Sequence, residues 1–232
     1  MRRAASVQHT CGVTDTAVPD APLPLPRYVR AAVIGPDSDF SEAIINAFST
    51  ADRRVDHLMP RELSTMTTPL SRSYDVVLVT VGPSSLESVL SGRAELLSDL
   101  VVVVCTSSVS SDEGGFFMEP VPDGGVANLV ARLLPNSRVV GALQQFNARH
   151  VVLGSLGALE TDVPVVSDDI EAADLIEGFI DEVRGFDSVY AGPLRSSAAI
   201  EGLAAVISEA ARERGGPAGF RLSQTGIKIL DR

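Results

Sequence analysis

The first turn of the chain that could bind a phosphate group follows the apolar segment at residues 29–34. From Gly35 to Ser41 this turn reads GPDSDFS, whereas a dinucleotide-binding turn needs the pattern G-x-G-x-x-G. The glycines of that pattern allow a tight turn, an approach of the pyrophosphate to the backbone and close packing of helix on strand. Only Gly35 is present, and Ser38 stands where the pyrophosphate would approach. The turn therefore departs from a conventional dinucleotide site.

Two acidic residues in the same turn offer another explanation of it. Asp37 and Asp39 put negative charge at the start of the following helix, where a phosphate would otherwise be attracted. Asp39 and Glu42 form a capping-box-like pair, which begins a helix without any ligand. Cofactor binding through Gly35, Asp37 and Ser38 and simple helix capping both stay open.

Side chains typical of other catalytic and metal sites are poorly placed along the chain. None of His9, His57 and His150 has a second His or Cys at a metal-ligand spacing, and no G-x-S-x-G nucleophile elbow occurs. Asp168 and Asp169 precede a periodic apolar segment, so we interpret them as helix caps instead of metal ligands. We therefore predict no metal site and assign no catalytic acid, base or nucleophile.

Cysteine usage and net charge limit the class of partner. The 232 residues include two cysteines, Cys11 and Cys105, and we interpret Cys105 as a buried, unreactive thiol. The net charge of −11 argues against nucleic acid and against a polybasic membrane anchor. The longest apolar run, at residues 100–105, is far shorter than the roughly 20 residues of a membrane-spanning helix. We expect a cytoplasmic protein with a small-molecule cofactor or substrate and no membrane or nucleic-acid partner.

Apolar strands alternate with helical segments between residues 28 and 145. Strands are predicted at about 29–34, 55–58, 75–81, 100–106 and 138–142, and helices at about 40–50, 85–97 and 126–134. Strands that are apolar from end to end are buried on both faces, which indicates a parallel sheet covered by helices on two sides. The predicted fold class is therefore α/β, with a Rossmann-like doubly wound parallel sheet whose ligands bind at the carboxyl ends of the strands.

Residues 1–27 and 146–232 flank this predicted domain. The first 27 residues are polar and proline-rich and are predicted to be a disordered leader. The C-terminal part is predicted to be small and mainly helical, with short strands at 163–166 and 188–191 and helices at 171–183 and 197–214. The apolar face of the last helix, from Ile200 to Ala211, either covers the protein's own sheet or packs against a second copy of the chain.

Four segments in the second half of the chain carry a family resemblance. They are VVGAL at 139–143 followed by Gln144, DVPVVSDD at 162–169, AGPL at 191–194 with Ser196, and GIKIL at 226–230. In this order and at this spacing they resemble the F420-dependent NADP oxidoreductases (NADPH:F420 reductases) over nearly all of residues 28–230. The resemblance implies a Rossmann domain for NADP, a small C-terminal helical part and a homodimer. It also implies direct hydride transfer between nicotinamide and the deazaflavin of coenzyme F420, which needs no acid, base or nucleophile.

The resemblance further implies which residues contact each cofactor. Thr80 and Val81 match the family's T-[IV]-P before the nicotinamide, with Gly82 in place of the proline. The residues implied around the deazaflavin are Ala142, Leu143, Gln144, Gly192, Pro193, Leu194 and Ser196. Those implied on the NADP side are Gly35, Asp37, Ser38, Arg61, Cys105 and Thr106.

Departures from the family pattern concentrate on the NADP side. The glycine-rich turn is reduced to Gly35, the S-R-[RN] element after the second strand is represented only by Arg61, and the loop at 105–109 reads CTSSV where a proline pair is usual. Two alternatives to an F420/NADP oxidoreductase therefore stay open. One is a relative that has lost NADP and uses a domain-junction pocket for another substrate, in an F420-dependent or a redox-neutral biosynthetic step. The other is a non-catalytic dimeric binding protein.

Overall fold

The computed structural model describes residues 29–50 and 53–223. The leader expected at residues 1–27 and the GIKIL segment at 226–230 lie outside the described residues. Within the described part, no helix combines the length and the apolar character that crossing a bilayer requires.

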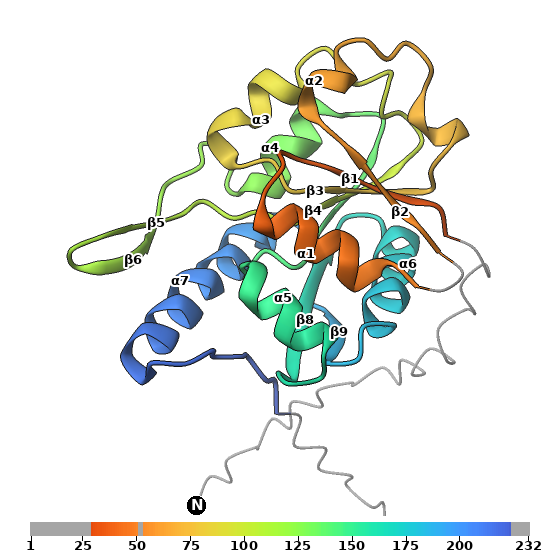
Figure 1. The fold of residues 1–232 in the computed structure, drawn as a ribbon. Helices are drawn as coiled ribbons and strands as arrows, with labels where there is room; N and C mark the ends of the chain where they lie inside the picture. Colours follow the sequence, from red (N-terminus) through yellow and green to blue (C-terminus); the bar gives the residue numbers. More distant parts are fainter. Residues whose placement is uncertain (1–28, 51–52, 224–232) are drawn as a thin grey trace, which may run out of the picture.

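A seven-stranded sheet forms the centre of the molecule (Figure 1). Its strands are, in spatial order, β2 (Val55–Leu58), β1 (Ala31–Ile34), β3 (Val76–Val79), β4 (Val101–Val104), β7 (Arg138–Gly141), β8 (Thr161–Ser167) and β9 (Phe186–Tyr190). Every neighbouring pair is parallel except β7 and β8, which are antiparallel. The predicted α/β, Rossmann-like doubly wound sheet is confirmed.

Helices cover both faces of the sheet because the strands are apolar on both faces. Val76 and Leu78 pack into one core cluster with α1 (Asp39–Phe48), α5 (Ala148–Ser155) and α6 (Ile170–Asp181). Val77 and Val79, which alternate with them, pack into a second cluster with α3 (Pro83–Leu90) and α4 (Val126–Leu133). The two core layers therefore follow from the end-to-end apolar strands seen in the sequence.

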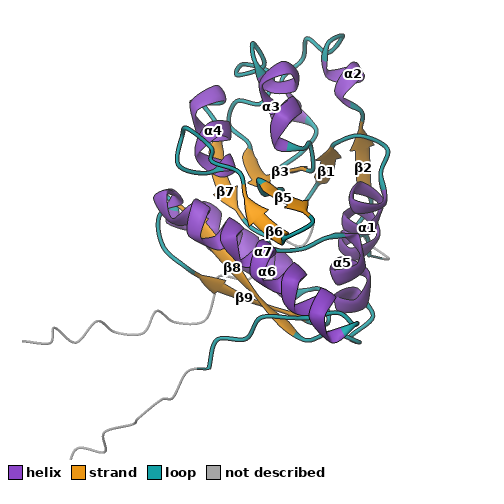
Figure 2. Ribbon diagram, turned by 90° about the vertical axis from the view of Figure 1, so that its left-hand side faces the viewer, coloured by secondary structure: helices purple, strands orange, loops and turns teal. Residues whose placement is uncertain are grey.

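The C-terminal part both extends the sheet and adds helices. Strands β8 and β9 lie beyond residue 145 and continue the central sheet, while α7 (Ser197–Arg214) follows a short 3-10 turn, η2 (Leu194–Ser196). Helix α7 lies beside a two-stranded hairpin formed by β5 (Val109–Asp112) and β6 (Gly115–Met118) (Figure 2). Its first turn also contacts the start of α4, which brings the C-terminal part to the carboxyl edge of β4 and β7.

Several element boundaries differ from the sequence expectation. The helix expected at 85–97 ends at Leu90, and Gly92 follows with φ +73°, a left-handed conformation that glycine adopts at little cost. The hairpin and α5 were not indicated by periodicity, because the strand Val109–Asp112 is mostly polar and α5 is short. Two further short helical elements, α2 (Pro60–Leu63) and η1 (Leu70–Arg72), connect β2 to β3.

Candidate functional site

The carboxyl ends of four parallel strands meet at one edge of the sheet. In the register of the sheet Ile34 pairs with Val79, Val79 with Val104, and Val104 with Gly141. The amides that follow extend this ladder: Thr80 N donates to Ile34 O at 2.9 Å, Cys105 N to Val79 O at 3.0 Å, and Ala142 N to Val104 O at 3.2 Å. The segments that follow β1, β3, β4 and β7 are therefore neighbours.

The first strand-to-helix turn is closed by its own side chains. Ser38, and not Asp39, is the N-cap of α1, because the Ser38 Oγ accepts a hydrogen bond from the Ser41 amide at 3.3 Å. This corrects the interpretation of Asp39 as the cap, since Asp39 is the first residue of the helix and is exposed, like Asp37. The cap occupies one of the amides that an anion at this helix end would use.

The one glycine of this turn is required by packing. The Ser41 and Thr80 hydroxyls lie 2.8 Å apart, and a Cβ at Gly35 would come within 1.9 Å of the Thr80 Oγ1. The carbonyl of Gly35 also lies 3.1 Å from the Nε2 of His57 on β2. Gly35 is therefore explained by the close approach of β1 to β3 without reference to a bound phosphate.

The NADP side of the edge fits a dinucleotide only in part. Arg61 lies exposed on α2, just after β2, where it could meet a phosphate on the ribose. At the pyrophosphate position the turn instead offers the exposed acids Asp37 and Asp39 and the Ser38 cap. This side of the edge therefore offers a cationic group to the phosphate on the ribose, but an unfavourable, negatively charged turn to the two phosphates of the pyrophosphate.

The loops after β3 and β4 are tied to each other. The Thr106 hydroxyl donates to the carbonyl of Val81 at 3.1 Å, and Gly82 is the N-cap of α3, with space for a side chain around its Cα. Burial raises the pKa of the Cys105 thiol far above its ordinary value. The interpretation of Cys105 as a buried, unreactive thiol agrees with this position, since the thiolate is the nucleophilic form.

The turn after β7 carries backbone strain. Leu143 has φ +63°, a left-handed conformation that costs a residue with a side chain about 1 kcal/mol or more. Ala142, Leu143 and Gln144 are buried, so their side chains are directed into the protein. A ligand at the strand edge would therefore meet mainly the backbone of this turn, and the Gln144 side-chain amide is held beneath it.

The turn before α7 is fixed by the segment that precedes α6. Gly192, with φ +111°, accepts a hydrogen bond at its carbonyl from the Ser167 amide at 3.1 Å. Asp169 is the N-cap of α6, as expected, but Asp168 instead accepts a hydrogen bond from the Leu194 amide at 3.0 Å. Leu194 is part of the core, whereas Pro193 and Ser196 are half-buried.

Gln144 connects this edge of the sheet to α7. Its Nε2 lies 3.2 Å from the Thr106 carbonyl, 3.4 Å from the Ser197 Oγ and 3.3 Å from the Glu201 Oε1. Glu201 also accepts hydrogen bonds from the Ser197 hydroxyl at 2.7 Å and the Val126 amide at 2.6 Å. A single carboxylate thus joins the turn after β7, the first turn of α7 and the start of α4.

The sequence reasoning did not identify Glu201, which the structure buries completely. Burial raises the pKa of its carboxyl, and the hydrogen bonds from the Ser197 hydroxyl, the Val126 amide and the Gln144 side chain oppose that shift. The signal that could have found it is positional: Ser197, Glu201 and Ala204 recur at helical spacing and form the buried face of α7. A carboxylate on a buried helical face needs partners, which predicts a polar cluster.

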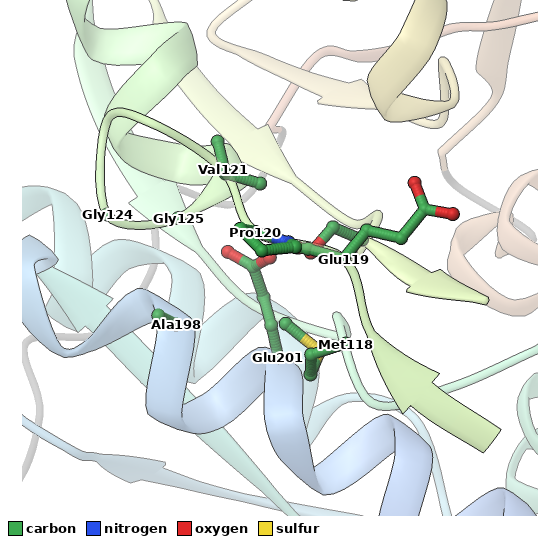
Figure 3. A pocket seen from close by; sticks show the side chains of 9 residues that line it. Met118, Glu119, Pro120, Val121, Gly124, Gly125, Ala198 and Glu201 are labelled. Atoms are coloured by element: carbon green, nitrogen blue, oxygen red, sulfur yellow. The ribbon is translucent and has the colours of Figure 1, made fainter.

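A pocket of about 310 Å³ opens beside Glu201 (Figure 3). Helix α7 contributes Ala198 and Glu201, and the start of α4 contributes Gly124 and Gly125. The exit of the hairpin contributes Met118, Glu119, Pro120 and Val121, with Ser108 beside them. None of the residues expected to bind a cofactor lines this pocket. Among the described residues, no cluster of three or more His, Cys, Asp or Glu is arranged to hold a metal.

Comparison with known proteins supports the resemblance seen in the motifs. No known protein-family profile matches the chain. The chain is 28% identical to an F420-dependent NADP reductase of Methanocaldococcus jannaschii over 137 residues. This aligned region covers 57% of this chain and 60% of that relative. The match thus spans about 60% of the relative's length.

Two crystal structures share the fold. One, from Arthrobacter sp. FB24, is provisionally described as an F420-dependent NADP reductase; its TM-score is 0.70 at 17% identity, over 84% of this chain and 100% of that chain. The other is a hypothetical protein of Sinorhizobium meliloti, with a TM-score of 0.55 at 17% identity, over 73% of this chain and 88% of that chain. The chain is therefore similar in sequence to an F420-dependent NADP reductase and shares its fold with these two structures.

Proposed function

We propose that the protein is an oxidoreductase that transfers hydride directly between the nicotinamide of NADP and the deazaflavin of coenzyme F420. The observation that supports this most is the convergence of the family-like segments. Thr80–Val81, Thr106 and Ala142–Gln144 follow three different strands and meet at one sheet edge. Ser196 is joined to that edge through the next residue, since the Ser197 hydroxyl lies 3.4 Å from the Gln144 Nε2. Gly192 instead lies beside Ser167, which pairs with Val140 inside the sheet. The cofactors would supply the redox chemistry when bound.

The contribution of the protein to such a reaction is positioning. The Thr80 hydroxyl is held by Ser41, and the loop after β4 is held by Val81 and Gln144. The strained backbone at Leu143 is held by a turn in which the Phe146 amide donates to the Leu143 carbonyl at 3.1 Å. A rigid edge of this kind suits a reaction whose rate depends on the distance and orientation of two bound rings.

A second candidate function is favoured by the first turn. The Ser38 cap and the acids Asp37 and Asp39 oppose a pyrophosphate. A relative with this turn could retain the deazaflavin while an organic substrate takes the place of NADP, or could catalyse a redox-neutral step. A homodimer is proposed for either function.

A fluorescence titration of oxidised coenzyme F420, without and with NADPH, separates these functions. Tight F420 binding together with oxidation of NADPH supports the first function. F420 binding that is indifferent to NADPH, with no turnover at high enzyme concentration, supports the second. If F420 does not bind at all, both F420-dependent functions are wrong.

Two matched variants test whether F420 binds at the turn before α7. Ser196→Phe introduces a large side chain at a half-buried position of this turn, whereas Arg195→Phe adds the same ring at the exposed neighbouring residue. Weaker F420 binding in S196F but not in R195F is expected. Equal binding by both variants would locate the deazaflavin elsewhere.

A further inference from the structure

The carboxylate of Glu201 is satisfied on one oxygen and not on the other. Its Oε1 accepts hydrogen bonds from the Val126 amide, the Ser197 hydroxyl and the Gln144 side-chain amide. Its Oε2 is buried and accepts no hydrogen bond from the described residues. The backbone of Ser108 is close enough to favour the charged carboxylate, but its amide is not aligned to donate a hydrogen bond to the Glu201 Oε2. A buried carboxylate oxygen without a donor is costly, so this atom calls for a partner.

That carboxylate lies at the wall of the pocket between α7, α4 and the hairpin exit. Figure 3 shows the Glu201 side chain extending from α7 toward Pro120. Gly125 makes the approach possible, since a Cβ there would come within 2.9 Å of the Glu201 Oε1 and 3.0 Å of the Ala198 amide nitrogen. The pocket volume of about 310 Å³ is at the lower end of the range for small-molecule sites.

The charge of the lining selects the kind of ligand. Glu201 is the buried carboxylate of the lining, and among the described residues no Lys, Arg or His lines the pocket. The other acidic lining residue, Glu119, is exposed, and its side chain extends away from Glu201 (Figure 3). Arg132 lies in a neighbouring hollow, but its guanidinium is bound to Asp123 and Glu87. The remaining walls are mainly apolar, from Met118, Pro120, Val121 and Ala198. A molecule that combines an ammonium group with a compact apolar body complements both features.

We propose that this pocket binds a small organic amine, whose ammonium group donates a hydrogen bond to the Glu201 Oε2. The ammonium supplies the missing donor and offsets the buried negative charge, while the apolar body fills the space beneath Pro120 and Val121. The site goes beyond the proposed hydride transfer and does not depend on it, because its lining shares no residue with the expected cofactor contacts. It assigns to Glu201 a binding role in addition to its contacts with α4 and Gln144.

The test uses three probes of nearly the same shape: benzylammonium, benzyl alcohol and benzoate. Binding to the full chain is measured by calorimetry and by NMR shifts of the Gly125 and Val126 amides. Benzylammonium is expected to bind saturably, benzyl alcohol about tenfold or more weaker, and benzoate not detectably, because a charge-assisted hydrogen bond is stronger than a neutral one. Equal binding of benzyl alcohol or benzoate, or no saturable binding of benzylammonium, overturns the proposal.

Three variants locate the site. Glu201→Gln keeps the size of the side chain and is expected to weaken benzylammonium binding about tenfold or more. Ala198→Leu fills the pocket from α7 without altering Glu201 and should abolish binding. Ala199→Leu, on the exposed neighbouring residue, is the matched control and should bind as the wild type does. If E201Q does not fold, the comparison of benzylammonium binding by A198L and A199L still tests the site. Unchanged binding by A198L would place the amine elsewhere and refute the proposed site.

Discussion

The carboxylate of Glu201 accepts a hydrogen bond of 2.6 Å from the amide of Val126, the first residue of α4, across 75 residues of sequence. Gly125, which precedes Val126, is the N-cap of α4 and has no side chain to satisfy the helix end. Helix α7 therefore supplies by tertiary contact what a Ser, Thr or Asp cap supplies locally in other helices. The connection makes the C-terminal part of the chain a structural support of the sheet edge.

Removing this carboxylate should destabilise the fold. Glu201→Ala leaves the Val126 amide, the Ser197 hydroxyl and the Gln144 amide without their shared acceptor, and the expected loss is about 3 kcal/mol in the free energy of unfolding. Glu201→Gln retains an acceptor oxygen and should lose about 1 kcal/mol. Urea unfolding followed by circular dichroism measures both values. An E201A variant as stable as the wild type would show that the contact contributes nothing to α4.

A side chain at Gly35 should be tolerated only if Thr80 is made smaller. Gly35→Ala brings a Cβ to within 1.9 Å of the Thr80 Oγ1 and is expected to destabilise the fold by about 2 kcal/mol or more. The double variant G35A/T80A removes the clashing oxygen and should recover part of the loss. Thermal unfolding of both single variants and the double variant completes the cycle, and strictly additive effects would contradict the packing explanation.

The ion pair between Arg138 and Asp169 should make stability depend on acid pH. Their side chains are 2.6 Å apart, and the hydrogen bonds from Arg138 lower the pKa of Asp169 to about 2. An acid with a lowered pKa in the folded state stabilises that state above its ordinary pKa of 3.8 and loses this contribution as the pH falls toward 2. Both side chains are 37% exposed, so solvent screening reduces the effect.

Asp169→Asn isolates that contribution, because asparagine is also a favourable N-cap for α6. The difference in urea midpoint between wild type and D169N should be present at pH 7 and shrink between pH 4 and pH 2. Asp169→Ala, which also removes the cap, should lose about 1 kcal/mol more at both pH values. A wild-type to D169N difference that does not change with pH would rule out the linkage.

The acids of the first turn should weaken NADPH binding if the dinucleotide uses that turn. Replacing both acids in Asp37→Asn/Asp39→Asn is expected to strengthen NADPH binding about two- to fivefold at low salt, with a smaller effect at high salt. The control is Glu113→Gln/Asp174→Asn, which makes the same change in net charge at exposed positions elsewhere. Equal effects of the two double variants would indicate a general charge effect and no phosphate contact in the turn.

Helix α7 leads us to expect a homodimer. Val206 is 65% exposed, and Ile200, Leu203, Ala210 and Ala211 on the same helix are only half-buried. Sedimentation velocity at micromolar concentration should find twice the mass of the chain, and Val206→Glu should shift the protein toward the monomer. A monomeric wild type would contradict the expectation and leave α7 as a cover of its own hairpin.

The sequence by itself determined that the chain forms a mainly parallel sheet with helices on both of its faces. Runs such as residues 76–79 and 101–104 are apolar at every position, so they are buried on both faces and require helices on both sides. Asp169 as a cap and Cys105 as a buried thiol were also readable, because each depends on the residues next to it in the chain. Local physics was sufficient for these features.

Only the tertiary structure decided which polar groups meet. The sequence placed the cap of α1 at Asp39, but the choice of Ser38 depends on where the chain leaves Gly35, which the contact with Thr80 fixes. The partners of Glu201 come from α4, the turn after β7, and α7 itself, and no local pattern brings Val126 and Gln144 to one carboxylate. The free energy of a buried charge depends on all its neighbours at once, and those neighbours are assembled only when the chain folds.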